Sequence, residues 1–300
     1  MKIAIGLDLG GTNISAGAIA ENGEVLNLEK VKTEAQKGKD FVLEKIKQII
    51  SSRIDSAKKK NWEISGIGIG SPGPLNIEKG IIFKMPNLPG WQNVSIIEIL
   101  EDEFPYSIKL NNDANCALLA EHWIGSAKGV ENCLGLTLGT GIGGGIIADN
   151  KLYTGASGGA GELGHMIIDQ NGPICGCGQK GCLESFVGGA NFLKKARKEG
   201  DFKEVEEIFQ KARDGEENAQ KLIDYYAHYL GLGLANLINI FNPEMIILGG
   251  QVIKSAEQFL EKTKEMAQKL SFESSFADCE IVLAKLGDKA GLIGAARLIL

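Results

Sequence analysis

Two segments of the chain repeat one pattern, in which a turn rich in glycine and threonine separates two short apolar stretches. The turns are Gly10-Gly11-Thr12-Asn13 and residues 139–144. The predicted strands that flank them are 2–9 and 14–19, and 133–138 and 145–148. Apolar runs bounded by such turns are typical of β-hairpins. Two such hairpins far apart in the chain predict two related α/β halves with an active-site cleft between them.

The rest of the chain alternates predicted helices and strands. Apolar residues at helical spacing predict a helix over 40–60, and a second helical pattern begins at Asp113. The other predicted strands are 24–28, 64–69, 108–110, 245–248 and 281–284, and the other long helix is 219–241. Such alternation is typical of the α/β class. We expect a smaller N-terminal domain (1–112), joined by the C-terminal helix 290–300, and a larger domain (113–289).

Composition excludes several classes of protein. The chain carries 38 acidic and 32 basic residues, a net charge of −6, and no stripe of lysine or arginine marks a nucleic-acid surface. Asp8 interrupts the first apolar stretch too early for a signal peptide, and no later stretch is long enough to cross a membrane. We therefore expect a cytoplasmic protein that binds neither nucleic acid nor membrane, with reduced cysteines.

The first glycine turn has the features of a phosphate-binding loop. Glycine lets backbone N–H groups approach a phosphate without a Cβ clash, and Thr12 and Asn13 add side-chain donors to Gly10 and Gly11. Asp8 ends the preceding strand, where a carboxylate can hold Mg²⁺ through water. The alternative is an ordinary hairpin turn, since glycine-rich hairpins are common.

The second turn matches G-x-G-x-x-G, but the context excludes a dinucleotide fold. That motif must open a helix, whereas here a predicted strand follows. No G-x-x-x-x-G-K-[ST] sequence is present either. Residues 139–144 are therefore predicted to form a second glycine-rich hairpin. Because two such hairpins in one chain are more specific than either alone, Gly139, Thr140 and Gly141 are also candidates for phosphate binding.

Asp113 is the candidate catalytic base. It lies beside Asn112 at a predicted strand-to-helix junction. Phosphorylation of a hydroxyl requires a base near the attacking oxygen and firm positioning of both reactants. The alternative is that Asp113 is an N-cap of the following helix. Its place between two phosphate hairpins favours the catalytic interpretation.

Four metal-binding side chains lie close together in the sequence: His165, Cys175, Cys177 and Cys182. Glycines separate them, so the loop can wrap a tetrahedral ion, and this soft ligand set suits Zn²⁺. Four protein ligands leave no open position, which indicates a structural ion. Glu162 and Glu184 flank the ligands and are predicted to face a ligand rich in hydroxyl groups.

The pair of hairpins resembles those of the actin, hexokinase and Hsp70 superfold (ribonuclease H-like). Gly249-Gly250, after an apolar strand, resembles the adenosine-binding element of that fold. The cysteine and histidine spacing, Gly161-Glu162-Leu163-Gly164-His165, Asn112-Asp113-Ala114-Asn115 and Pro86-Asn87-Leu88-Pro89-Gly90-Trp91 together resemble the ROK family over nearly the whole chain.

The ROK resemblance implies an ATP-dependent kinase that phosphorylates a hexose at O6, with glucose as the leading substrate and Mg²⁺ bound with ATP. It implies that Asp113 is the base and that His165 serves both zinc and sugar. It also implies a homodimer. The sugar-binding residues that it implies are Asn87, Asn112, Asp113, Glu162, His165 and Glu184.

Three alternatives remain. The substrate can be another sugar: N-acetylmannosamine, N-acetylglucosamine, mannose, allose or fructose. The chain can be a non-catalytic sugar-binding regulatory protein, although Asp8, Thr12, Thr140 and Asp113 argue against loss of catalysis. A repressor of the same family carries a winged helix-turn-helix before the sugar domain, and a strand that begins at Lys2 leaves no room for one.

Overall fold

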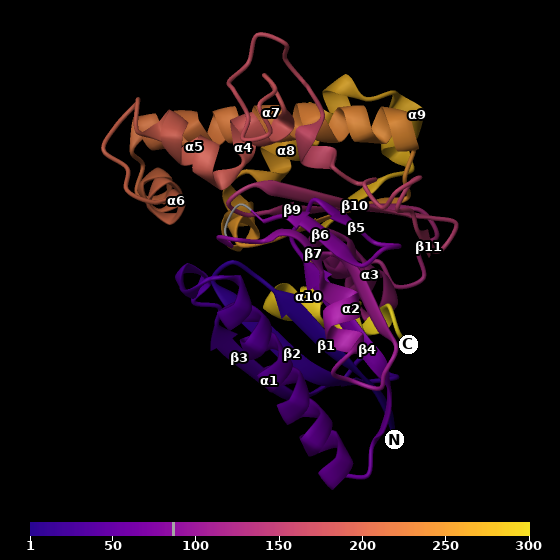
Figure 1. The fold of residues 1–300 in the computed structure, drawn as a ribbon. Helices are drawn as coiled ribbons and strands as arrows, with labels where there is room; N and C mark the ends of the chain where they lie inside the picture. Colours follow the sequence, from indigo (N-terminus) through magenta and orange to yellow (C-terminus); the bar gives the residue numbers. More distant parts are fainter. Residues whose placement is uncertain (86–87) are drawn as a thin grey trace. The chain divides into compact units, whose positions relative to one another are not determined.

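The computed structural model describes residues 1–85 and 88–300 (Figure 1). By its internal contacts the chain divides into two compact units. The first unit comprises Met1–Gly129, Lys151–Gly161 and Lys285–Leu300, and the second comprises Val130–Asn150 and Glu162–Ala284. The predicted domain limits, 1–112 with 290–300 and 113–289, stay a prediction.

The sheet of the first unit has the strand order β3-β2-β1-β4-β8. Its strands are β1 (Lys2–Leu9), β2 (Asn13–Ala20), β3 (Val25–Lys32), β4 (Glu63–Ser71) and β8 (Ile108–Asn112). The β1–β2 and β2–β3 pairs are antiparallel, whereas β4 runs parallel to β1 and β8 runs parallel to β4. The carboxyl ends of β1, β4 and β8 therefore meet at one edge, and Asp8, Gly70 and Asn111 lie in register there.

Helices cover this sheet, and glycines bring one of them unusually close. The helix α1 (Lys39–Lys59) buries Val42, Ile46, Ile49 and Ile50, as the helical spacing predicts. The helices α3 (Asp113–Ile124) and α10 (Ala290–Arg297) pack together against the sheet. A Cβ on Gly68 would lie 1.7 Å from the carbonyl oxygen of Ala295, so α10 touches the backbone of β4 directly.

The second unit repeats the strand order of the first, which confirms the two related halves predicted from the hairpins. Its strands run in the order β10-β9-β12-β13. They are β9 (Cys133–Leu138), β10 (Ile142–Ala148), β12 (Met245–Gly249) and β13 (Glu280–Leu283). As in the first unit, the hairpin pair β9–β10 is antiparallel and the next two strands are parallel. The strand β10 begins before the predicted residue 145, because Gly143 and Gly144 pair with β9.

An aromatic cluster forms the core of the second unit. Phe192, Phe209, Tyr226 and Phe259 are fully or almost fully buried and contact one another mainly at tilted and edge-on angles. The helices around them are α4 (Leu183–Val187), α5 (Gly189–Ala196), α6 (Val205–Arg213), α7 (Glu217–Phe241), α8 (Leu260–Leu270) and α9 (Glu273–Ala277), with the 3-10 turns η2 (Leu163–His165) and η3 (Val252–Gln258). Among the described residues, no helix is both long and apolar enough to cross a membrane.

Several short elements were not predicted from the sequence, because strands of two to four residues and helices of one or two turns show no usable periodicity. They are β5 (Leu75–Asn76), β6 (Ile81–Lys84), β7 (Gln92–Ser95), β11 (Lys151–Leu152), α2 (Ile96–Glu101), η1 (Ala35–Lys37) and η4 (Gly287–Lys289). The first three form a small antiparallel sheet in the first unit. Asn87, a predicted sugar ligand between β6 and β7, lies outside the described residues.

Candidate functional site

The tip of the first hairpin holds unused backbone donors. The N–H of Gly10 donates to the carbonyl of Asn13 at 3.0 Å and closes the turn. In the chain as described, without residues 86 and 87, the N–H groups of Gly11 and Thr12 have no hydrogen-bond acceptor. Thr12 is exposed at the tip. Converging free N–H groups of this kind can bind an anion.

Asp8 lies at the base of this hairpin in an environment that resists ionisation. The start of α10 covers it: a Cβ on Gly291 would lie 3.1 Å from the Asp8 carboxyl group. Burial, and after it the charge of Asp113, raise the pKa of Asp8 from an ordinary value of 3.8 to about 7, although Lys30 lowers it. Asp288 also raises the Asp8 pKa. A divalent cation would offset this accumulation of negative charge.

The second hairpin is built in the same way. Gly139 N–H donates to the carbonyl of Gly141 at 3.0 Å. The carbonyls of Gly139 and Thr140 accept hydrogen bonds from the N–H groups of Gly189 and Ala190, at 2.8 and 2.9 Å. Among the described residues the N–H groups of Thr140 and Gly141 have no acceptor. Both predicted phosphate loops therefore present free donors at their tips.

The structure assigns the capping role at α3 to Asn112. Its side-chain oxygen accepts hydrogen bonds from the N–H groups of Ala114, at 2.9 Å, and Asn115, at 3.4 Å. Asp113 follows as the first helical residue, and its Oδ1 also accepts from Ala114 N–H at 2.8 Å. Asn112 is therefore the N-cap residue, and Asp113 shares only the N–H of Ala114 with it, so the catalytic role of Asp113 stays a prediction.

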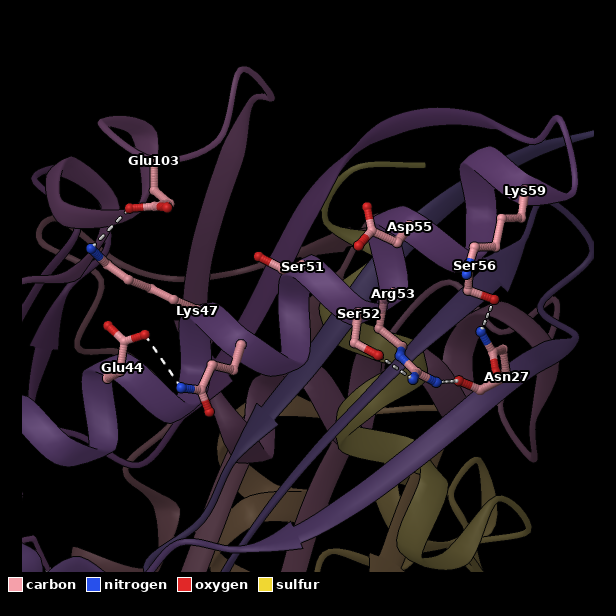
Figure 2. A pocket seen from close by; sticks show the side chains of 11 residues that line it. Asn27, Glu44, Lys47, Ser51, Ser52, Arg53, Asp55, Ser56, Lys59 and Glu103 are labelled. Carbon is pink, nitrogen blue, oxygen red and sulfur yellow. Dashed lines mark hydrogen bonds and ion pairs between the residues drawn. The ribbon is translucent and has the colours of Figure 1, made fainter.

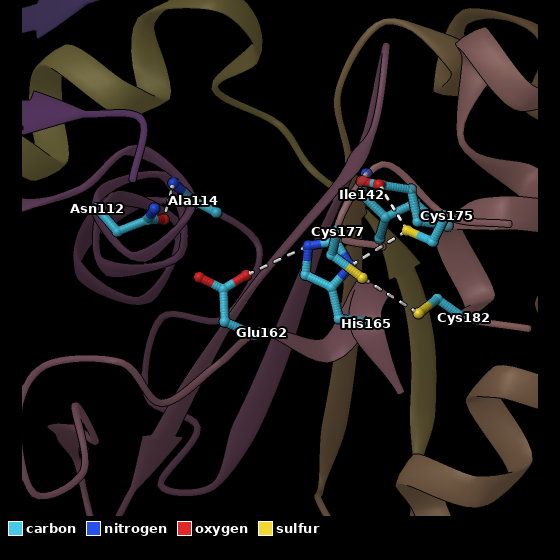
Figure 3. Close-up of polar contacts among 9 residues, drawn as sticks. Asn112, Ala114, Ile142, Glu162, His165, Cys175, Cys177 and Cys182 are labelled. Atoms are coloured by element: carbon cyan, nitrogen blue, oxygen red, sulfur yellow. Dashed lines mark hydrogen bonds and ion pairs between the residues drawn. The ribbon is translucent and has the colours of Figure 1, made fainter. Parts of the chain in front are cut away.

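The predicted zinc ligands lie together in the second unit (Figure 3). One ligand atom from each of His165, Cys175, Cys177 and Cys182 falls within 4.8 Å of every other. The Cys177 and Cys182 sulfurs are 3.7 Å apart, and Cys175 Sγ is 3.5 Å from His165 Nδ1. Zinc bonds of about 2.3 Å to sulfur and 2.0 Å to nitrogen, in tetrahedral geometry, give separations of about 3.8 and 3.5 Å. The donor set fits Zn²⁺.

The two nitrogens of His165 face different partners (Figure 3). Its Nδ1 faces Cys175, whereas its Nε2 lies 4.0 Å from Glu162 Oε2. The two oxygens of Glu184 also face different partners: Oε1 lies 3.4 Å from Cys175 Sγ, and Oε2 accepts a hydrogen bond from the N–H of Ile142 at 2.9 Å. Glu162, His165 and Glu184, three of the predicted sugar ligands, are therefore linked through the cysteine cluster. Asn112 and Asp113 belong to the first unit.

Gly249 and Gly250 end β12 in a tight turn. Gly250 has a φ of +90°, and a Cβ on it would lie 2.3 Å from the carbonyl oxygen of Leu138. Only glycine fits this backbone position. The turn thus packs against the end of β9, with Gly249 buried and Gly250 exposed, and its adenosine-binding role stays a prediction.

A surface hollow along α1 is a weaker candidate (Figure 2). Two of its basic side chains are paired: Lys47 with Glu103 at 3.2 Å, and Arg53 with Glu29 and the carbonyl of Asn27. Its three basic lining residues are matched in number by three acidic ones. No predicted site residue lines it. The hollow therefore offers no unbalanced charge for a substrate.

Sequence reasoning missed the residues that support the site. Lys30 lies opposite Ser15 in the β2–β3 pair, and Ser15 lies opposite Asp8 in the β1–β2 pair. In the sequence, Lys30 was visible only as a polar residue in a predicted strand. Asp288 lies just before a helix, and Glu121 lies inside one, so each looked like an ordinary surface charge. Their relation to Asp8 and α3 depends on the tertiary fold.

Comparisons with known proteins agree with this architecture. The family model described as ROK family matches residues 4–300. The glucokinase of Thermotoga maritima is 35% identical over 98% of this chain and 96% of its own. The xylose repressor of Caldicellulosiruptor bescii is 36% identical over 99% of this chain and 77% of its own.

A solved structure shares the fold as well. A ROK family glucokinase from Streptomyces griseus, in complex with glucose and AMPPNP, is similar with a TM-score of 0.81 and 30% identity over 99% of both chains. The family prediction and the actin/hexokinase-like fold class are confirmed.

Proposed function

The chain belongs to the ROK family, and from that premise we propose that it is an ATP-dependent sugar kinase. It transfers the γ-phosphoryl group of ATP to O6 of a hexose, with glucose as the preferred substrate. The observation that carries this proposal is the pair of hairpins with free N–H donors, the first of which lies beside Asp8 and Asp113. A relative with 35% identity is named a glucokinase.

The nucleotide would bind through both hairpins. The free N–H groups at their tips, from Gly11, Thr12, Thr140 and Gly141, suit phosphate oxygens. Gly10, Asn13 and Gly139 shape the loops, and the turn at Gly249-Gly250 would receive the adenosine. The similar glucokinase is described in complex with AMPPNP, an ATP analogue, which supports this assignment.

Asp8 would hold Mg²⁺ through a water molecule. The bound ion neutralises phosphate charge during transfer. In return, a cation beside the carboxyl group favours the ionised form, which burial and Asp113 disfavour here. Asp8 and the nucleotide-bound ion would therefore stabilise each other.

Asp113 would accept the proton of the attacking hydroxyl. It stands in the first turn of α3, where Asn112 caps the helix and fixes the backbone that carries the carboxylate. Asn112, Glu162, His165, Glu184 and Asn87 would hold the sugar hydroxyls. A carboxylate fixed on a helix end can be placed against one hydroxyl among several, which would direct the reaction to O6.

Zinc would act as a structural ion. Cys175, Cys177, Cys182 and His165 Nδ1 would hold it, which leaves His165 Nε2 beside Glu162 for the sugar. The ion would thus fix the loop that orients Glu162 and Glu184. We further propose that domains 1–112 with 290–300 and 113–289 close around the substrates to exclude water, and that the protein is a homodimer.

A second function is favoured by one observation. A relative with 36% identity is named a xylose repressor, so a sugar-binding regulatory role is the alternative. The two functions differ in turnover. A regulator binds a sugar without releasing ADP, whereas a kinase releases ADP in proportion to sugar phosphorylated.

The test is ADP release from Mg-ATP with glucose, mannose, fructose, allose, N-acetylglucosamine and N-acetylmannosamine. We expect glucose to give the highest kcat/KM. Asp113→Asn should retain glucose binding and lose about 100-fold or more in kcat, the usual size of a general-base contribution. The matched control is Asp55→Asn, which changes an exposed carboxylate on α1. No turnover with any sugar, together with sugar binding, would support the regulatory alternative.

A further inference from the structure

Thr33 connects the end of β3 to the tip of the first hairpin by two hydrogen bonds. Its hydroxyl donates to the carbonyl of Gly10 at 2.7 Å, and its backbone N–H donates to the carbonyl of Thr12 at 2.9 Å. The Thr33 side chain is 0% exposed. A buried hydroxyl of this kind has no water to replace a lost partner, so the bond is hard to exchange.

The bond to Gly10 determines the direction of a donor at the tip. A peptide group is planar and trans, so the carbonyl of one residue and the N–H of the next point in opposite directions. With the Gly10 carbonyl turned towards Thr33, the N–H of Gly11 points away from it. That N–H has no acceptor among the described residues, and it is one of the proposed phosphate donors.

The second hairpin shows the same device with other atoms. There the carbonyls of Gly139 and Thr140 accept from the N–H groups of Gly189 and Ala190, and the N–H groups of Thr140 and Gly141 stay free. Anchoring the tip carbonyls is thus common to both loops. In the second loop the anchor is backbone, whereas in the first it includes one side chain that a substitution can remove.

We propose that Thr33 is a positioning residue for the nucleotide: its hydroxyl holds the Gly10 carbonyl so that Gly11 N–H faces the phosphates of ATP. The proposal rests on the proposed kinase function and adds to it a residue that does not itself touch a substrate. Without the hydroxyl, the Gly10–Gly11 peptide is free to rotate, and the donor is no longer fixed before the nucleotide binds.

Thr33→Val tests the hydroxyl alone, because valine has nearly the same shape and keeps the backbone N–H. We expect the KM for ATP to rise about tenfold, because the substitution removes one hydrogen bond and leaves a buried acceptor unpaired. The KM for the sugar should stay within about twofold. Thr33→Ser keeps the hydroxyl and should restore most of the ATP affinity. This split between the two substrates would not follow from a general loss of stability.

The chain offers a matched control in Thr263. That side chain is also 0% exposed, but its hydroxyl has no hydrogen-bond partner in the chain as described. Thr263→Val therefore makes the same chemical change in a buried position without breaking a bond. Its KM for ATP should equal that of the unchanged protein.

Direct titration with Mg-ADP separates the possible failures. If the unchanged protein neither binds Mg-ADP nor turns over, the kinase function and this proposal both fall. If it binds Mg-ADP and Thr33→Val binds equally well, only the role of Thr33 is overturned. If Thr33→Val does not fold, NMR of the unchanged protein provides the test. A shift of the assigned Gly11 amide resonance on adding Mg-ADP supports the proposal, and the absence of a shift overturns it.

Discussion

Glu184 Oε2 accepts a hydrogen bond from the backbone N–H of Ile142 at 2.9 Å, so the residue that follows the cysteine loop is tied to the second hairpin. Its other oxygen lies 3.4 Å from Cys175 Sγ. There is little space between the two elements: a Cβ on Gly141 would lie 2.3 Å from Glu184 Oε2. One carboxylate thus links the proposed zinc loop to a proposed phosphate loop.

Glu184→Ala should therefore impair both substrates. The change removes a proposed sugar contact and also the anchor of Ile142, so we expect the KM for glucose and the KM for ATP each to rise about tenfold, as for one lost hydrogen bond to a charged group. Steady-state kinetics with each substrate varied in turn measure both. Glu206→Ala, which removes an exposed carboxylate on α6, is the control. A change in the glucose KM alone would refute the link to the hairpin.

Zinc should be present at one ion per chain and should matter for sugar affinity. Cys177→Ser replaces one of the four proposed zinc ligands and so weakens zinc binding. The loop that carries Glu162 and Glu184 is then no longer fixed by the ion. Elemental analysis should show loss of zinc, and the KM for the sugar should rise about tenfold or more, in the range seen when a metal site is perturbed. Cys279→Ser removes a thiol outside the cluster and should retain zinc. A protein purified without zinc but with full sugar affinity would contradict the assignment.

Asp8 should make the nucleotide-free protein less stable as the pH rises. Its pKa is about 7 in the folded chain, against an ordinary value of 3.8. The folded state therefore holds a proton that the unfolded state releases, and stability falls between about pH 4 and pH 7. Asp8→Asn removes this dependence and should raise the Tm by about 2–5 °C at pH 8 while abolishing turnover.

Thermal melts without Mg²⁺ at pH 5 and pH 8 test this. The gain from Asp8→Asn should be small at pH 5 and larger at pH 8. Asp55→Asn, on the exposed face of α1, should show no such trend. An Asp8→Asn protein that melts lower at pH 8 would show that the ionised carboxylate is stabilising instead.

Glu121 should be among the residues on which folding of the first unit most depends. Its buried carboxylate accepts the N–H groups of Ser126, Lys285 and Leu286 at 2.8–2.9 Å, which ties the end of α3 to the segment before α10. Glu121→Ala leaves three donors unpaired. At about 1–3 kcal/mol each, we expect a loss of about 3 kcal/mol or more in the free energy of unfolding.

Urea unfolding measures this loss, and Glu101→Ala, at the exposed end of α2, is the control. The control should change the free energy of unfolding by less than about 0.5 kcal/mol, as surface substitutions usually do. Equal stability of the two variants would mean that water replaces the Glu121 carboxylate.

The fold class was predictable because its signals are local. The hairpins at 9–14 and 138–142, the spacing of the cysteines from Cys175 to Cys182 and the periodicity of α1 all lie within a few residues of one another. Backbone geometry over such distances depends on residue type, since glycine opens the turns and apolar spacing sets the period. Short strands such as β5 and β7 escaped because two to four residues carry no period.

From the sequence alone we predicted the longer strands and helices of both halves and the glycine loops. The sequence also indicated a candidate metal-ligand set, Asp8 as a candidate Mg²⁺ residue and Asp113 as the candidate catalytic base. Only the tertiary structure decided which donors at the loop tips stay free, that Asn112 and not Asp113 caps α3, and that Thr33, Glu121 and Glu184 hold these elements in place. The reason is physical. Hydrogen bonds such as that from Thr33 to Gly10 join residues distant in sequence, and burial of Asp8 arises only when α10 packs against β1.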